Sequence, residues 1–222
     1  MPIVLSTSEL AGYIDHTMLD VSTTAPDIRR LCQEATEFGF KAVCVRPRHA
    51  AWAVRQLAES PVLVAAVLNF PAGDAEQQEL LDELASLLYS GVDEIDYVMA
   101  LPAALSGDWD KVADDLSIVL ERAHVHDVRV KVIIEACLLS DAEKVQACQV
   151  ALAGGADFIK TSTGYSQGGA TLADVRLLRA SVGEAMGVKA SGGIHDQATA
   201  LAMIEAGASR IGTSHGLAII GD

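Results

Sequence analysis

Two lysines and one aspartate have the residue types and the surroundings that carbonyl chemistry needs. Lys160 ends the run A-D-F-I-K and is followed by T-S-T-G, Lys189 lies in V-K-A-S-G-G, and Asp96 ends G-V-D-E-I-D. A lysine in apolar surroundings loses hydration, which lowers its pKa. A shift from ~10.4 to ~7–8 corresponds to roughly 4 kcal/mol of lost ammonium stabilisation. We therefore expect Lys160 to be a neutral amine that can attack a carbonyl group.

The surroundings of Lys160 admit two interpretations. In the catalytic one, the ammonium group of Lys189 disfavours protonation of Lys160, and Asp96 transfers protons. In the structural one, Lys160 belongs to a buried ion-pair network in which Asp15 and Asp96 neutralise Lys131, Lys160 and Lys189. A lysine whose stem lies along the rim of a barrel is a further structural alternative.

Small-residue loops follow the last three predicted strands. They read T-S-T-G-Y, S-G-G and G-T-S-H-G and begin at residues 161, 191 and 212. Backbone amides in such loops can approach and hold a phosphate without much basic charge. Residues 214–220 are predicted to form a short extra helix whose N-terminus faces the same region. We expect the phosphate-binding residues to be Gly164, Gly192, Gly193, Gly212 and Ser214.

Further polar residues lie at the ends of predicted strands, where parallel barrels carry their active sites. Hydroxyl, carboxylate, amide and ammonium groups in these places can form hydrogen bonds with a small polar substrate. The residues that we predict to bind the substrate in this way are Asp15, Thr17, Asn69, Lys131 and Thr161.

The elements that carry these residues alternate regularly between strand and helix. Strands are predicted over residues 13–17, 41–46, 61–69, 93–99, 129–135, 156–161, 188–191 and 210–213. Helices are predicted over residues 6–11, 25–38, 47–59, 74–89, 108–124, 140–153, 171–185 and 196–206. This alternation predicts a (β/α)8 TIM barrel that forms one domain over residues 1–222. A doubly wound open sheet is the rival, but no G-x-G-x-x-G motif follows the first strand.

A weak internal repeat supports the alternation. Four predicted helices end in a glycine that a strand follows, at Gly39, Gly91, Gly155 and Gly207. The residues five positions later are therefore expected at equivalent depths in the barrel. These residues are Cys44, Asp96, Lys160 and Gly212.

The composition narrows the possible partners. The chain has 222 residues, half of them apolar, and a formal net charge of −14. This charge argues against nucleic acid or an anionic membrane as a partner. The longest apolar run is too short to span a bilayer, and no signal peptide is visible, so we expect a cytoplasmic protein that acts on small molecules.

Neither the cysteines nor the histidines are spaced like a metal site. The four cysteines form no C-x-x-C pair, and we expect reduced thiols and no bound metal. Three histidines, His16, His195 and His215, are nevertheless predicted near the barrel mouth. Their position would suit a metal-dependent lyase, which is one alternative function.

At these motifs the chain resembles the deoxyribose-phosphate aldolases. The similarity covers nearly the whole chain and is carried by I-D-H-T, G-V-D-E-I-D, K-V-I-I-E, G-A-D-F-I-K-T-S-T-G and V-K-A-S-G-G-I. It implies a barrel enzyme without metal or cofactor that forms a homodimer or higher homo-oligomer. The implied reaction converts 2-deoxy-D-ribose 5-phosphate reversibly to D-glyceraldehyde 3-phosphate and acetaldehyde. The implied roles are Schiff-base lysine for Lys160, its electrostatic partner for Lys189, and proton-relay carboxylate for Asp96.

Some positions depart from the pattern of the family. Asp20 follows I-D-H-T-M-L where many relatives have lysine, Tyr165 stands where some carry lysine, and His215 is unusual after the terminal serine. None of these departures affects the three implied catalytic residues. A barrel that binds a phosphosugar without catalysis remains the other alternative, although a binding protein need not keep two lysines beside a carboxylate.

Overall fold

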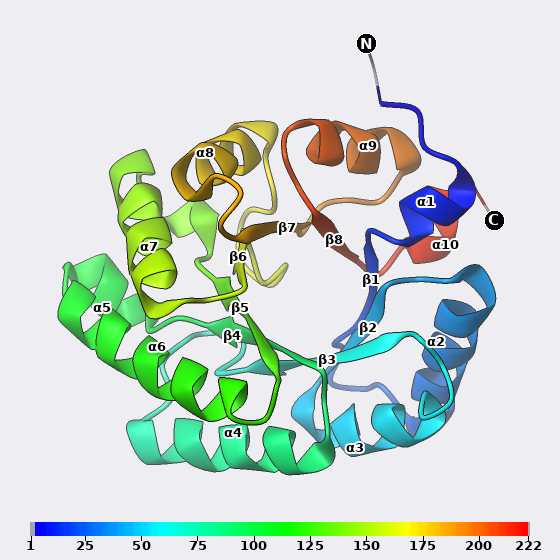
Figure 1. Ribbon diagram of the computed structural model, residues 1–222, viewed down its shortest axis with the longest axis horizontal. Coiled ribbons are helices and arrows are strands. Elements are labelled where there is room, and N and C mark those ends of the chain that lie inside the picture. Colours follow the sequence, from blue (N-terminus) through cyan, green and yellow to red (C-terminus); the bar gives the residue numbers. More distant parts are fainter. Residues whose placement is uncertain (1–2, 222) are drawn as a thin grey trace.

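Eight parallel strands close into a barrel within residues 3–221, which are the residues described by the structure, a computed structural model (Figure 1). The strands are β1 (Ile14–Met18), β2 (Ala42–Val45), β3 (Leu63–Leu68), β4 (Glu94–Val98), β5 (Arg129–Ile133), β6 (Phe158–Lys160), β7 (Gly187–Ser191) and β8 (Arg210–Thr213). Each pairs with the next, and β8 pairs with β1, where Ile211 lies opposite Ile14. The prediction of a single (β/α)8 barrel is confirmed.

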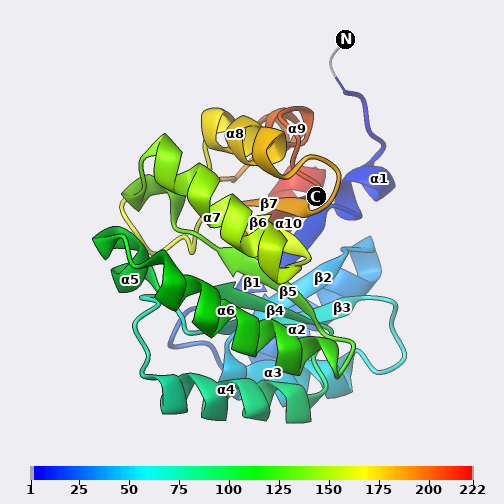
Figure 2. The same cartoon turned by 60° about the vertical axis from the view of Figure 1, so that its left-hand side comes forward.

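Helices surround the barrel in both ribbon views (Figures 1 and 2). They are α1 (Thr7–Ala11), α2 (Ala25–Phe38), α3 (Pro47–Gln56), α4 (Gln77–Ser90), α5 (Leu101–Ser106), α6 (Trp109–His124), α7 (Asp141–Gly154), α8 (Leu172–Val182), α9 (Gln197–Glu205) and α10 (Gly216–Ile220). A 3₁₀ turn, η1 (Ala136–Leu138), follows β5. Neither α5 nor η1 was predicted from the sequence.

The helix ends explain why the alternation could be predicted and why α5 was missed. Gly39, Gly91 and Gly155 end α2, α4 and α7 with φ of 69°, 77° and 81°, a left-handed conformation that glycine adopts without strain. The segment L-P-A-A-L-S-G uses the same signals in a shorter element. Pro102 lies in the first turn of α5, and Gly107 ends it, so residues typical of a loop bound a helix here.

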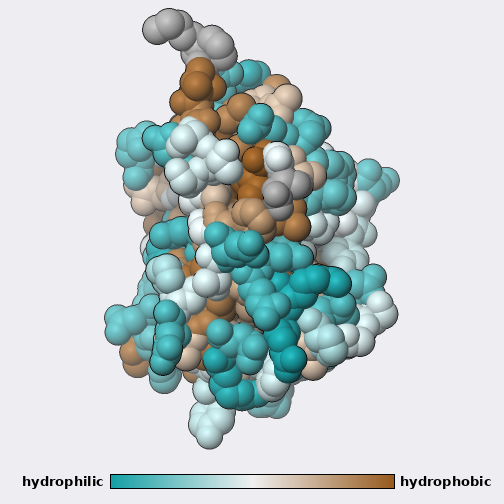
Figure 3. Space-filling view, turned by 90° about the vertical axis from the view of Figure 1, so that its right-hand side faces the viewer, coloured by the Kyte–Doolittle hydropathy of each residue, from teal (hydrophilic) through white to brown (hydrophobic). Residues whose placement is uncertain are grey.

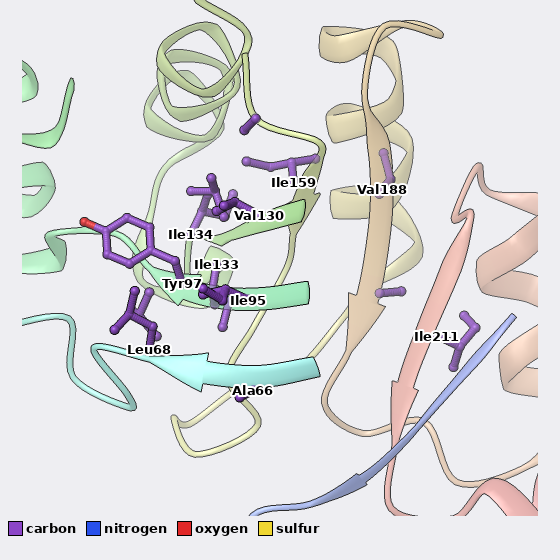
Figure 4. Close-up of a cluster of buried hydrophobic side chains, with 14 of the residues drawn as sticks. Ala66, Leu68, Ile95, Tyr97, Val130, Ile133, Ile134, Ile159, Val188 and Ile211 are labelled. Carbon is purple, nitrogen blue, oxygen red and sulfur yellow. The ribbon is translucent and has the colours of Figure 1, made fainter. Parts of the chain in front are cut away.

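The hydrophobic core lies mainly between the barrel and its helices. Figure 4 shows part of this layer, with Leu68, Ile95, Ile159, Val188 and Ile211 drawn from five different strands. A separate small cluster contains Leu19, Cys44, Ala65 and Val67. Because side chains alternate along a strand, the residues next to the outer set point into the barrel, and many of them are charged.

Helices α1 and α10 lie side by side at one edge of the molecule (Figure 1). Apolar side chains gather on this face of the molecule (Figure 3), and Val4 is among the large apolar residues that are exposed. Within residues 3–221, no helix has both the length and the apolar character that a membrane span needs.

Candidate active site

Asp96 is the centre of a buried charge cluster inside the barrel. Its Oδ2 atom accepts hydrogen bonds from Lys160 Nζ and from Lys189 Nζ, each across 2.7 Å. Its Oδ1 atom accepts a hydrogen bond from Lys131 Nζ across 2.8 Å. The three lysines and the aspartate are all buried. The structure thus brings together the three residues that the sequence analysis proposed as catalytic.

Two further carboxylates and an arginine extend the cluster below Asp96. Asp15 accepts from Lys189 Nζ across 2.5 Å and from Arg210 Nη1 across 2.6 Å. Glu94 lies 2.5 Å from Lys131 Nζ and 3.0 Å from Arg210 Nη2. The ion-pair network of the structural interpretation is therefore present, and the residues of the catalytic interpretation belong to it.

The balance of charge in this cluster distinguishes Lys160 from the other bases. The buried bases are Lys131, Lys160, Lys189 and Arg210, and the buried acids are Asp15, Glu94 and Asp96. With every group ionised, the interior holds four positive charges against three negative ones, and the partly exposed Arg129 adds another beside Glu94. Loss of one proton from any of the three lysines brings the buried set into balance. Because a buried excess charge is costly, the cluster favours one free amine. Among the described residues Lys160 has one carboxylate partner, whereas Lys189 has two and Lys131 has three.

The pKa shifts agree with this balance. Burial lowers the pKa of Lys160, and together with the repulsion from Lys189 it outweighs the attraction of Asp96, so the pKa stays below its usual value. Burial also acts to lower the pKa of Lys189, but Asp15 and Asp96 outweigh it and raise the pKa above the usual value. Burial acts to raise the pKa of Asp96, yet three lysines hold it well below its usual range. Lys160 is thus the one lysine of the cluster that loses its proton more readily.

The strand register places these groups side by side. Lys131 on β5 lies opposite Asp96 on β4, and Lys189 on β7 lies opposite Lys160 on β6. Gly212, on β8, leaves room for Lys189, because a Cβ atom at position 212 would lie 2.9 Å from Lys189 Cε. Gly212 was predicted to bind phosphate, and the structure places it in the path of this lysine.

A pocket of about 750 Å³ opens above Lys160 at the C-terminal ends of the strands. Of the seven buried charged residues of the cluster, Lys160 is the one that lines it. All five predicted phosphate-binding residues lie in the wall, namely Gly164, Gly192, Gly193, Gly212 and Ser214. A carbonyl compound in this pocket would therefore meet the amine of Lys160 at its floor and glycine loops at its wall.

The glycine loops of this wall are built from backbone that packs against backbone. Gly164, Gly192 and Gly193 have φ of 83°, 86° and 77°. A Cβ atom on Gly169 would come within 2.3 Å of the Gly192 carbonyl oxygen. The segments around Gly169 and Gly192 can therefore pack this closely only because position 169 has no side chain. Backbone without side chains allows a close approach to its amide groups, which can bind an oxyanion.

Of the predicted substrate-binding residues, Thr17 lines the pocket and the others lie outside its wall. Thr17 lines the pocket, where its hydroxyl donates to the Asp15 carbonyl oxygen across 2.8 Å. Asn69 instead holds a turn, since its amide donates to Val98 O and accepts from Ala75 N. The other three predicted residues also lie outside the pocket wall, because Asp15 and Lys131 belong to the charge cluster and Thr161 bonds to the backbone of β7.

Sequence reasoning missed several charged residues that support the site. Glu94 and Arg210 join the cluster, although each stands two residues from a group on the inner face, Asp96 and Gly212. Period-two alternation carried one step further along each strand would have found them.

Period-two alternation over the predicted strand 129–135 would place Glu135 on the same face as Lys131, but β5 ends at Ile133 and Glu135 lies in the loop region. It is buried with φ of 49°, and its carboxylate accepts bonds from the backbone N–H and the hydroxyl of Thr163. The Thr163 hydroxyl in turn accepts from Tyr165 N across 3.0 Å. Glu135 therefore anchors the loop that follows Lys160.

The departures from the family pattern occupy the mouth of the pocket. Tyr165 packs edge-on against Phe70, with ring centres 5.2 Å apart, and the guanidinium group of Arg46 lies beside both rings. Asp20 accepts bonds from the backbone and hydroxyl of Ser22. His215 contacts His195. Tyr165 and Asp20 thus take part in local packing and turn formation.

The histidines of the mouth are distributed between two places. His16 Nε2 lies 2.7 Å from Glu34 Oε2, whereas His195 and His215 contact each other. In the described part of the chain, no three His, Cys, Asp or Glu side chains come together in a way that could hold a metal ion.

Comparison with known proteins gives consistent matches over almost the entire chain. Residues 10–221 match the model of the DeoC/LacD family aldolases. A deoxyribose-phosphate aldolase from Aciduliprofundum boonei is 49% identical over 212 residues, which are 96% of each chain. The structure is similar to that of an aldolase named QR15, with 37% identity, a TM-score of 0.91 and coverage of 96% and 94% of the two chains. It also matches a tetrameric deoxyribose phosphate aldolase from Aeropyrum pernix, with 32% identity, a TM-score of 0.91 and coverage of 97% and 91%.

Proposed function

The chain belongs to the DeoC/LacD family of aldolases, and from this premise we propose that it cleaves 2-deoxy-D-ribose 5-phosphate reversibly through a Schiff base on Lys160. The products are D-glyceraldehyde 3-phosphate and acetaldehyde. The observation that carries the proposal is the position of Lys160, whose pKa is lowered by burial and which alone in the charge cluster lines the pocket. The names of the relatives support the choice of substrate.

The first half of the reaction makes an electron sink from the sugar aldehyde. The neutral Nζ of Lys160 attacks C1 of the open-chain sugar, and loss of water gives an iminium ion. The 3-hydroxyl then gives its proton to the relay of Asp96 and Lys189, directly or through water. The C2–C3 bond breaks, and its electron pair moves into the iminium to form an enamine. C3 leaves as the aldehyde carbon of glyceraldehyde 3-phosphate.

The second half returns a proton and frees the lysine. Protonation of the enamine at C2 gives the iminium of acetaldehyde, and water hydrolyses it to acetaldehyde and the amine. Lys189 and Asp96 form the relay that supplies this proton, directly or through water. The 2.7 Å contacts of both lysines with one oxygen of Asp96 support this assignment, since a proton on Lys189 lies one carboxylate away from Lys160.

The other residues position the substrate or the catalytic groups. Gly164, Gly192, Gly193, Gly212 and Ser214 hold the phosphate, and Thr17 meets a sugar hydroxyl. Asp15, Lys131 and Gly212 act through Lys189 and Asp96, while Asn69 and Thr161 fix the backbone around the site. We also infer a cytoplasmic homo-oligomer that takes part in nucleoside catabolism. The tetrameric relative and the exposed apolar side chains Val4, Tyr89 and Val125 support oligomerisation.

A cleavage assay tests the proposal and separates it from the two alternatives. The purified protein is mixed with 2-deoxyribose 5-phosphate, and glyceraldehyde 3-phosphate is measured with and without EDTA. The imine scheme predicts turnover that EDTA leaves unchanged and that Lys160→Met abolishes. Turnover lost with EDTA would support the metal-dependent lyase, and binding of the sugar without any turnover would support the phosphosugar-binding barrel.

A further inference from the structure

His195 and His215 form a pair of imidazole rings at the wall of the pocket. His195 follows β7 and His215 follows β8, and their Nδ1 atoms lie 3.0 Å apart. The ring centres are 4.4 Å apart and the rings are almost perpendicular, at 81°. Both rings line the same pocket as Lys160 and the glycine loops, and both are exposed to it rather than buried in the core. The reaction scheme above gives them no role.

The contact between the two Nδ1 atoms determines which ring nitrogen can bind an additional proton. One Nδ1 atom must carry a hydrogen and the other must accept it, so the neutral pair has one Nε2–H donor and one bare Nε2. A proton added to the bare Nε2 leaves the contact intact and gives one positive charge with two Nε2–H donors. Neither Nε2 atom has a hydrogen-bond partner within residues 3–221, so both are available to a ligand.

The other basic side chains of the pocket wall already have acidic partners. Lys160 contacts Asp96, His16 contacts Glu34, and Arg30 lies 3.2 Å from Asp27 and 3.8 Å from Glu34. Asp20 and Glu34 add negative charge to the same wall. A phosphate monoester brings about −1.5 to −2 charges at neutral pH, into a protein whose net charge is −14. Without a further positive charge, the polar groups of the glycine loops would have to bind the phosphate against the negative charge of the protein.

We propose that the His195–His215 pair carries the positive charge that selects a phosphorylated substrate. This inference rests on the proposed function and adds the residues that decide the preference for a phosphosugar over the free sugar. The carboxylate of Asp196 follows His195 directly and caps α9 through Thr199, so it is engaged in the helix cap. Ser214 Oγ, 3.1 Å from His215 Nδ1, holds the second ring in place.

Substrate discrimination tests the inference. The value of kcat/KM is measured for 2-deoxyribose 5-phosphate and for 2-deoxyribose in the wild type, in the double variant His195→Gln/His215→Gln, and in His126→Gln. His126 is exposed and lies outside this pocket, so it serves as the matched control. The ratio of the two kcat/KM values is expected to fall at least tenfold in the double variant and to stay constant in the control. A double variant whose ratio stays within twofold of the wild type would overturn the inference.

Binding of inorganic phosphate gives a readout that does not depend on turnover. The ring signals of the histidines are followed by NMR while phosphate is added. The inference predicts that phosphate shifts the signals of His195 and His215, and that its Kd rises at least tenfold in the double variant. Signals that phosphate leaves unmoved, or a Kd that the double substitution leaves unchanged, would refute it. A wild type that binds phosphate through the pair but cleaves no sugar would refute the proposed reaction and not this site.

Discussion

Lys160 and Lys189 donate to the same oxygen atom of a single carboxylate, each across 2.7 Å. Their remaining partners differ, because Lys189 also contacts Asp15 across 2.5 Å, whereas Asp96 is the one carboxylate that Lys160 contacts within residues 3–221. Two ammonium groups so close repel each other, and the lysine with fewer acidic partners loses its proton first. The shared oxygen thus makes Lys160 the amine and Lys189 the ammonium.

Replacement of Lys189 by methionine tests this division. The substitution removes the repelling charge and leaves Asp96 to Lys160, so the pKa of Lys160 rises. Since only the free amine attacks, each unit of increase lowers its fraction about tenfold at a pH well below that pKa. We expect kcat/KM near neutral pH to fall at least tenfold and to recover as the pH increases. Lys144→Met, which changes a lysine that pairs with Asp174 away from the site, is the control. A variant with the wild-type pH profile would remove Lys189 from the scheme.

Replacement of Gly212 by alanine tests the position of Lys189 without removing its charge. The new Cβ would meet Lys189 Cε and Ser191 Cβ, each at 2.9 Å. The lysine stem is flexible and can yield, so we expect a folded protein whose ammonium group is displaced from Asp96. The pH profile should move in the same direction as that of Lys189→Met, by a smaller amount. If a folded Gly212→Ala variant keeps the wild-type pH profile, the space that Gly212 leaves for Lys189 is not needed for activity.

The fold was predictable because its signals are local. Helix-ending glycines and period-two strands fixed the sequence of elements, and the inner face of β4 and β6 identified Asp96 and Lys160. The charge cluster could be predicted only in part, because Arg210 and Glu94 meet across the barrel, 116 residues apart in the chain. Contacts such as these depend on closure of the sheet, which no single segment encodes.

Which of the predicted substrate-binding residues line the pocket also could not be predicted from single segments. Asp15 and Thr17 share one face of β1, and their types alone cannot show which is deeper in the barrel. The structure places Asp15 beside Lys189 and Thr17 at the pocket. Asn69 is a turn residue with φ of 57°, a conformation that asparagine adopts more readily than most residues and that sequence reasoning overlooked.

Stability at acid pH tests the network itself. Burial acts to raise the pKa of Asp15, but Lys189 and Arg210 outweigh it and lower the pKa to about 2. A carboxylate whose pKa falls on folding stabilises the protein above its unfolded pKa, and this stabilisation is lost as the pH falls from about 4 to about 2. It amounts to roughly 2 kcal/mol of the free energy of unfolding.

Urea unfolding at pH 5 and pH 3 measures this contribution. The wild type should lose stability between the two pH values, and Asp15→Asn should lose less of it over the same interval. Asp74→Asn, a change at an exposed aspartate, should follow the wild type. Equal losses in Asp15→Asn and the wild type would mean that Asp15 is not held as an ion pair.

The contact of Thr163 with Glu135 is expected to stabilise both the fold and the pocket. Thr163→Val keeps the shape but removes the hydroxyl that donates to the buried Glu135 and accepts from Tyr165 N. We expect a loss of about 1–3 kcal/mol in the free energy of unfolding and a higher KM for the phosphosugar. Thr163→Ser keeps the hydroxyl and should restore most of both. If valine and serine behave alike, the hydroxyl does not anchor this loop.

Covalent trapping tests the central claim most directly. The protein is mixed with 2-deoxyribose 5-phosphate or acetaldehyde and reduced with borohydride, and the modified peptide is identified by mass spectrometry. Lys160 is predicted to carry the reduced adduct, and Lys131 and Lys189, which lie in the same cluster but outside the pocket wall, are predicted to remain free. A folded protein that cleaves the sugar but carries no adduct on Lys160 would contradict the account.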